Sequence, residues 1–151
     1  MRWLTLFVLG CFGAAVAPAL AQNNYASLLA EGDVMLRDFP FGSGETLPEL
    51  RIHYATLGTP RRDAAGRIVN AVMVLHGTGG SGRQFLQPQF ADELYGPGQP
   101  LDIRRYYIIL PDGIGHGRSS KPSDGLRMRF PAYDYSDMVE AHRRMLVEGL
   151  G

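Results

Sequence analysis

A glycine-rich stretch at residues 76–82, His-Gly-Thr-Gly-Gly-Ser-Gly, has the residue types in this sequence that are best suited to chemistry. It directly follows the apolar run Ala71–Leu75, which is typical of a β-strand. Gly77, Gly79 and Gly80 have no Cβ, so the backbone there can turn sharply and approach a ligand closely. Backbone N–H groups held in such a loop can stabilise the oxyanion that forms during acyl transfer. The alternative interpretation is an ordinary turn between a strand and a helix.

A second glycine-containing loop follows the apolar run Tyr106–Leu110 and the pair Pro111-Asp112. Ligands of α/β sheets bind beyond the carboxyl ends of the strands, so one interpretation gives Asp112 a place in a binding site. We favour a structural role, in which the carboxylate accepts backbone N–H bonds and holds the loop. The other structural residues expected in this loop are Gly115, Gly117 and Ser119.

The four histidines do not form an evident catalytic set. His76 is expected to hold the glycine-rich loop by hydrogen bonds, and His116 to pack within the second loop. His142 lies four residues from both Met138 and Leu146, which predicts a place on a helix face that contacts the sheet. His53 is expected to point outward from a strand.

Other kinds of site find no support in the spacing of the residues. Neither Ser81 nor Ser119 lies within a G-x-S-x-G nucleophile motif, and that motif occurs nowhere in the chain. The glycine runs do not form the G-x-G-x-x-G pattern of dinucleotide-binding proteins. The spacing of His76, Asp112 and His116 matches no established metal-ligand pattern. We therefore expect no cofactor and no metal.

The strands that would position these loops can be read from the hydrophobic pattern. Asp33–Phe39 and Leu50–Leu57 are expected to pair as an antiparallel hairpin about the turn Gly42–Gly44, because the second run alternates apolar and polar residues. Ala71–Leu75 and Tyr106–Leu110 are continuously apolar. Such runs are typical of parallel strands buried on both faces.

Two helices are expected between and after these parallel strands. Arg83–Tyr95 has helical spacing but must be interrupted at Pro88. Asp134–Glu148 predicts a helix capped by its first residue or by Ser136 and ended at Gly149. Parallel strands joined by helices favour an α/β fold with a mostly parallel, doubly wound sheet, here with an N-terminal antiparallel hairpin.

Composition indicates an ordinary globular protein. Of the 151 residues, 45% are hydrophobic, and 15 basic side chains balance 15 acidic ones. The basic residues form no cluster that would bind a polyanion, so no nucleic-acid partner is expected.

The first 21 residues have the pattern of a secretory signal peptide, with Arg2, a following apolar run and the small-residue site Ala19–Ala21. Cleavage after Ala21 would leave residues 22–151 as a domain exported to the periplasm or the exterior. The only cysteine, Cys11, would be removed, and its surroundings resemble a lipoprotein cleavage box only faintly. The apolar run is too short to be a stable membrane span.

From Glu45 onward the sequence resembles the homoserine O-acetyltransferase branch of the α/β-hydrolase superfamily. The resemblance rests on the strand Leu50–Gly58, on the line Asn70–His76, and on the loop from Asp112 to Ser119, which has the superfamily spelling D-x-x-G-x-G-x-S. It implies that Thr78 supplies an oxyanion-hole N–H from its backbone. Members of the branch carry alanine at the position of Gly77, whereas His-Gly is the commoner spelling among hydrolases.

The resemblance also implies nucleophilic acyl chemistry on a small-molecule substrate through a Ser-His-Asp-type triad. Because the nucleophile, acid and general base of the family come later in the chain, these residues are expected to be the N-terminal part of the domain, truncated before the nucleophile elbow. Export separates the protein from acetyl-CoA, so we favour ester or related acyl hydrolysis over acyl transfer. Relatives with an aspartate nucleophile, and a non-catalytic truncated fragment, are the remaining alternatives.

Overall fold

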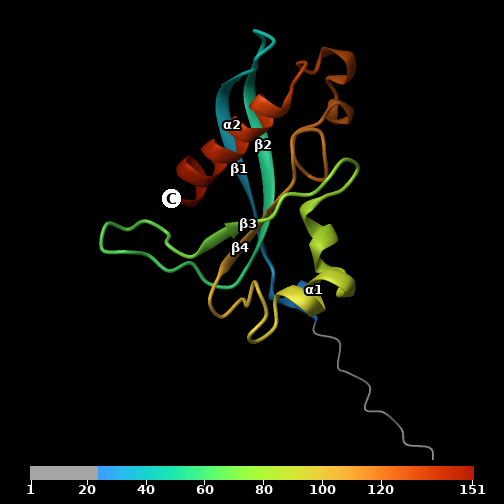
Figure 1. Cartoon of the computed structure of the whole chain (residues 1–151). Coiled ribbons are helices and arrows are strands. Elements are labelled where there is room, and N and C mark those ends of the chain that lie inside the picture. The colour runs from blue at the N-terminus through green and yellow to red at the C-terminus, as the bar shows by residue number, and fades with distance from the viewer. Residues whose placement is uncertain (1–23) are drawn as a thin grey trace, which may run out of the picture.

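The computed structural model describes residues 24–151, and the expected signal peptide lies outside these residues. The sheet has four strands in the order β1-β2-β4-β3 (Figure 1). The strands are β1 (Ala30–Pro40), β2 (Thr46–Leu57), β3 (Ala71–Met73) and β4 (Tyr107–Pro111). β2 pairs antiparallel with both β1 and β4, and β3 pairs parallel with β4. The mixed sheet and its N-terminal hairpin confirm the expected fold class.

The hairpin is longer than the apolar pattern predicted. Its register places Leu36 opposite Leu50 and Asp33 opposite His53, and pairing continues out to Ala30 and Thr56. Backbone hydrogen bonds do not require an alternating apolar pattern, so β1 begins at Ala30 and β2 at Thr46, before the strands that the pattern predicted.

The prediction that Ala71–Leu75 is buried on both faces was wrong. β3 ends at Met73, and its three residues are exposed or only half-buried, while Leu75 is 52% exposed. β3 lies at the edge of the sheet within the described residues, so neighbours cover it from one side only. The same prediction holds for β4, where every residue is buried between β2 and β3.

Helices cover both faces of the sheet. The two main helices are α1 (Pro88–Leu94) and α2 (Tyr135–Arg144), and Figure 1 shows α2 lying along the β1–β2 hairpin. Successive residues of β4 point to opposite faces: Ile109 packs in one core cluster with Ala141 of α2, and Ile108 packs in another with Ala91 of α1. The arrangement is a three-layer α/β/α sandwich.

Both predicted helices differ in detail from the observed ones. The first is divided into a 3₁₀ helix, Gly82–Leu86, and α1, which begins at Pro88. Proline is tolerated at the first position of a helix because the N–H that it lacks would have no partner within the helix. After α2 the chain continues in a π-helical segment, Met145–Leu150, so Gly149 does not end the helix as predicted. A Cβ on Gly149 would overlap the side chain of Val34, so this glycine instead lets the segment pack closely on β1.

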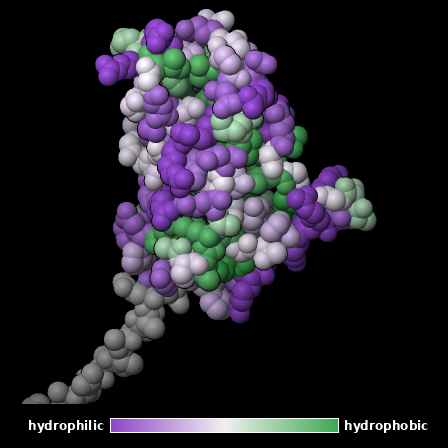
Figure 2. Space-filling model, turned by 180° about the vertical axis from the view of Figure 1, so that it is seen from behind, coloured by the Kyte–Doolittle hydropathy of each residue, from purple (hydrophilic) through white to green (hydrophobic). Residues whose placement is uncertain are grey.

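The surface mixes polar and apolar residues. Figure 2 shows hydrophilic residues over most of one face, interrupted by smaller hydrophobic areas. Within residues 24–151, no helix combines the length and the apolar character that crossing a bilayer requires.

Candidate functional site

The first loop, residues 76–82, makes a tight turn immediately beyond β3. The N–H of Gly80 donates to the carbonyl oxygen of Gly77 at 3.0 Å, which closes a four-residue turn with Thr78 in its second position. Gly79, in the third position, has a φ of 78°, a conformation that favours glycine. The turn therefore depends on the glycine that follows Thr78.

The second loop, residues 112–120, is held to the first by the carboxylate of Asp112. Oδ1 accepts the N–H of Gly82 at 2.8 Å, and Oδ2 accepts the N–H of Arg118 at 2.7 Å. Asp112 is buried, so these charge-assisted bonds replace the water that the carboxylate would otherwise bind. A single buried side chain at the end of β4 thus fixes both loops.

Ser119 links the second loop to the sheet. Its buried hydroxyl donates to the carbonyl oxygen of Asp112 at 2.7 Å and accepts the backbone N–H of His53 at 2.9 Å. Gly115 and Gly117 have φ values of 82° and 51°, and a Cβ on Gly117 would overlap the Asp112 carboxylate. These contacts require a small residue at Gly117 and a hydroxyl at Ser119.

Both histidines of the loops use their two ring nitrogens within the loops. The Nε2 atom of His76 accepts the N–H of Gly113 at 2.9 Å, so the ring proton is on Nδ1, which lies 2.9 Å from the carbonyl oxygen of Gly77. His116 has the same pattern, with the N–H of Gly79 3.4 Å from its Nε2 and the carbonyl oxygen of Ile114 3.0 Å from its Nδ1. Neither imidazole is free to act as a general base in this arrangement.

His53 does not point into solvent, which corrects the expectation from the alternating pattern. It is 3% exposed, and its Nδ1 lies 2.8 Å from Oδ1 of Asp33 on the paired strand. β1 pairs with β2 at His53, the N–H of Asp112 donates to the His53 carbonyl oxygen, and β4 pairs with β2 from Tyr54 onward. Core clusters contain both Ile52 and Ala55, which point to opposite faces, so the polar His53 is buried with its neighbours. The carboxylate of Asp33 supplies the hydrogen-bonding partner that burial of an imidazole requires.

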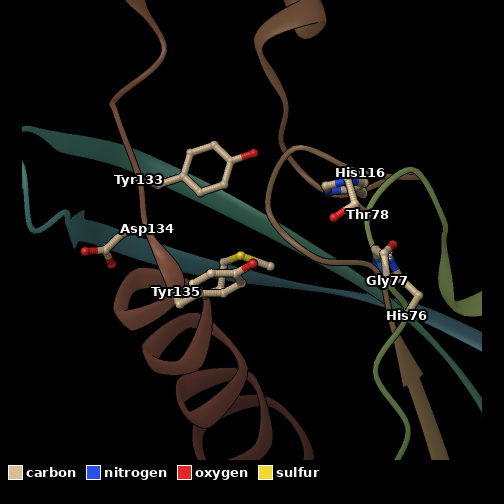
Figure 3. A pocket seen from close by; sticks show the side chains of 8 residues that line it. His76, Gly77, Thr78, His116, Tyr133, Asp134 and Tyr135 are labelled. Atoms are coloured by element: carbon tan, nitrogen blue, oxygen red, sulfur yellow. Dashed lines mark hydrogen bonds between the residues drawn. The ribbon is translucent and has the colours of Figure 1, made fainter.

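A cavity of about 420 Å³ lies between the first loop and the start of α2 (Figure 3). His76, Gly77 and Thr78 form one wall together with His116, and residues 133–138 form the other. The expected binding residues Gly79 and Gly80 lie outside this cavity and line an open depression beside Arg83. The structure therefore brings Gly77 and Thr78 to one cavity and separates the next two glycines from it.

The wall formed by residues 133–138 was not recognised in the sequence. It contributes Tyr133, Tyr135 and Met138 to the cavity, together with Asp134. Asp134 caps α2 through bonds from the N–H groups of Ser136 and Asp137, at 2.7 and 3.2 Å. In the sequence, the only sign of this wall is that Tyr133 and Tyr135 flank the helix-capping residue Asp134. Their position opposite the glycine-rich loop depends on the fold.

His142 lines a smaller cavity of about 160 Å³ that adjoins the first and shares His76, Tyr135 and Met138 with it. The imidazole is 6% exposed, and its Nε2 has no hydrogen-bond partner within residues 24–151. Burial, and to a smaller extent the nearby His76, lowers the pKa of His142, so the ring is held in its neutral form.

The backbone N–H of Thr78 takes part in none of the hydrogen bonds formed within residues 24–151. A backbone N–H at a cavity wall can donate to an oxygen atom of a ligand. Over the same residues, no group of three or more histidine, cysteine or acidic side chains is arranged to hold a metal ion.

No family model matches the chain. In sequence it is similar to the homoserine O-acetyltransferase of Moorella thermoacetica, with 39% identity over 72% of this chain and 32% of the relative. It is also similar to the homoserine O-acetyltransferase of Pelobacter propionicus, with 33% identity over 83% of this chain and 37% of the relative. The chain thus spans about a third of the length of these relatives.

The fold is shared with an acetylester hydrolase from Corynebacterium glutamicum, with a TM-score of 0.68 and 24% identity over 81% of this chain and 34% of that one. The chain belongs to the homoserine O-acetyltransferase-like branch of the α/β-hydrolase superfamily, a family that handles acyl groups.

Proposed function

We propose that the full-length protein hydrolyses esters or related acyl compounds, and that the backbone N–H of Thr78 donates to the oxyanion formed in that reaction. The observation that carries the proposal is the position of Thr78: it lines the cavity of about 420 Å³, and its N–H makes no hydrogen bond within residues 24–151. Negative charge develops on the carbonyl oxygen as a nucleophile attacks, and an N–H fixed beforehand stabilises that charge without reorganising.

The loop contacts support this role because they hold the donor in place. Gly79 sets the turn, His76 ties the loop to Gly113, and Asp112 fixes the end of the loop at Gly82. The sequence contains no G-x-S-x-G motif, so the proposal assigns only the anion-stabilising part of a serine mechanism to these residues.

Acyl transfer to homoserine is the second candidate, because the sequence relatives are homoserine O-acetyltransferases. We favour hydrolysis because we also propose that the protein is exported. That proposal rests on Arg2, the apolar run and the Ala19–Ala21 site. A protein outside the cytoplasm would not meet acetyl-CoA, whereas water is always available.

One experiment separates the candidates. The full-length protein is given p-nitrophenyl acetate in one reaction, and acetyl-CoA with homoserine in another, and the products are measured by absorbance and by mass spectrometry. We expect saturable release of p-nitrophenol and no O-acetylhomoserine. O-acetylhomoserine as the main product would establish transfer instead, and the absence of both products would refute acyl chemistry.

A further inference from the structure

A charged cluster centred on Glu31 of β1 contacts the side chains of Arg83 and Arg118. The Oε1 atom of Glu31 accepts a hydrogen bond from the guanidinium of Arg83, which follows the first loop. Its Oε2 atom lies 3.1 Å from a guanidinium nitrogen of Arg118 in the second loop. One carboxylate on the N-terminal hairpin therefore contacts both segments.

Arg83 and Arg118 lie next to, or at, the two residues whose backbone N–H groups Asp112 binds. Asp112 binds the N–H of Gly82, the residue before Arg83, and also the N–H of Arg118 itself. Glu31 binds the guanidinium groups of Arg83 and Arg118, whereas Asp112 binds backbone N–H groups. The loops are thus fixed twice, by a buried carboxylate from β4 and by a carboxylate from β1.

The position of Glu31 is itself well defined by the hairpin. It pairs with Ala55 in the antiparallel register, and its side chain is 29% exposed. The Nε2 atom of buried His53 lies 3.9 Å from its Oε1, and Asp33 binds the other nitrogen of that ring. Glu31 therefore lies within the hydrogen-bonded part of the hairpin and beside a buried side chain.

We propose that Glu31 is a positioning residue, which holds the first and second loops in register through Arg83 and Arg118 and so maintains the Thr78 N–H in the cavity wall. As far as it concerns turnover, this rests on the proposed acyl chemistry. Exposed ion pairs contribute little individually, and Arg83 and Arg118 are more than half exposed. The expected effect is accordingly local and moderate.

The test compares Glu31→Gln with Glu49→Gln in the full-length protein. Glu49 is the matched control, because it pairs with Arg37 on the same hairpin but does not contact the loops. Amide hydrogen exchange is measured by NMR at Gly82, Gly113 and Arg118, whose N–H groups are bonded within the loops. We expect Glu31→Gln to raise exchange there about three- to tenfold, with the hairpin amides unchanged, and Glu49→Gln to raise it nowhere in the loops.

Steady-state kinetics on p-nitrophenyl acetate provide the second readout. Glu31→Gln should lower kcat about three- to tenfold with little change in KM, because positioning of an oxyanion donor matters in the transition state. Equal loop exchange in the two variants, or a uniform rise that includes the hairpin, would overturn the positioning role. If the wild-type protein hydrolyses no ester, the proposed function fails, while the exchange result still decides whether Glu31 orders the loops.

Discussion

The backbone N–H of Gly82 donates to Oδ1 of Asp112 at 2.8 Å, although the two residues are 30 positions apart in the chain. This bond joins the start of the 3₁₀ helix after the first loop to the end of β4. Because Oδ2 of the same carboxylate accepts the N–H of Arg118, the two loops cannot move apart without exposing a buried charge.

Replacing Asp112 with alanine should therefore destabilise the fold strongly. The substitution removes the carboxylate that accepts two hydrogen bonds. The N–H groups of Gly82 and Arg118 then lose the acceptor that they have in the fold. We expect the free energy of unfolding to fall by about 3 kcal/mol or more, measured by urea denaturation. Asp63→Ala is the control, since Asp63 also accepts two backbone N–H bonds but lies in an exposed loop. A similar loss in both variants would contradict the role given to burial.

Gly82→Ala tests the close packing at the same point. A Cβ on Gly82 would overlap the backbone carbonyl of Leu110, whereas a Cβ on Gly77 would meet no atom within 4 Å. Overpacking of this kind costs about 1–3 kcal/mol, so Gly82→Ala should lower the unfolding free energy by that amount. Gly77→Ala should be close to wild type. Thermal denaturation of both variants followed by circular dichroism compares them directly.

Thr78→Pro should damage turnover far more than Thr78→Ala. Proline deletes the backbone N–H, and alanine keeps it. Loss of one oxyanion donor lowers kcat by about 10²- to 10³-fold, so we expect that loss for Thr78→Pro and near wild-type kcat for Thr78→Ala. Circular dichroism of Thr78→Pro shows whether the fold is retained. Equal rates in two folded variants would remove Thr78 from the mechanism.

Stability should decline as the pH falls through the ordinary pKa of histidine, partly because of His142. Burial lowers the pKa of His142 in the fold below its usual 6.5, so in acid the unfolded chain binds a proton that the folded chain does not. The stability contributed by the neutral ring is therefore complete above 6.5 and is lost as the pH drops below it. His142→Phe, which cannot be protonated, should lose less stability than wild type between about pH 8 and pH 5.5 in urea titrations. Identical pH dependence in the two proteins would show that another group controls it.

The protein recovered outside the cytoplasm should begin at Gln22. Signal peptidases cleave after a small-residue site, here Ala19–Ala21. Mass spectrometry of the N-terminal peptide decides this point. A cytoplasmic pool that retains Met1 would refute export, restore acetyl-CoA as a donor and favour acyl transfer.

The sequence alone determined the local elements, because their signals lie between neighbouring residues. The alternation in Leu50–Leu57 predicted a strand, the continuous apolar run Tyr106–Leu110 predicted buried β4, and Asp134 was among the expected helix caps. The two glycine-rich loops were placed after their strands for the same reason, and the family resemblance followed from their spelling and order.

Tertiary structure alone decided which distant residues meet. His53 is buried because β2 is covered on both faces and β1 supplies Asp33, whereas β3 is more exposed than its apolar sequence suggests because it lies at the edge of the sheet. The wall of Tyr133 and Tyr135 faces Thr78 only after α2 packs on the sheet. Burial and contact depend on how strands and helices are ordered in space, and the hydrophobic period of one segment does not encode that order.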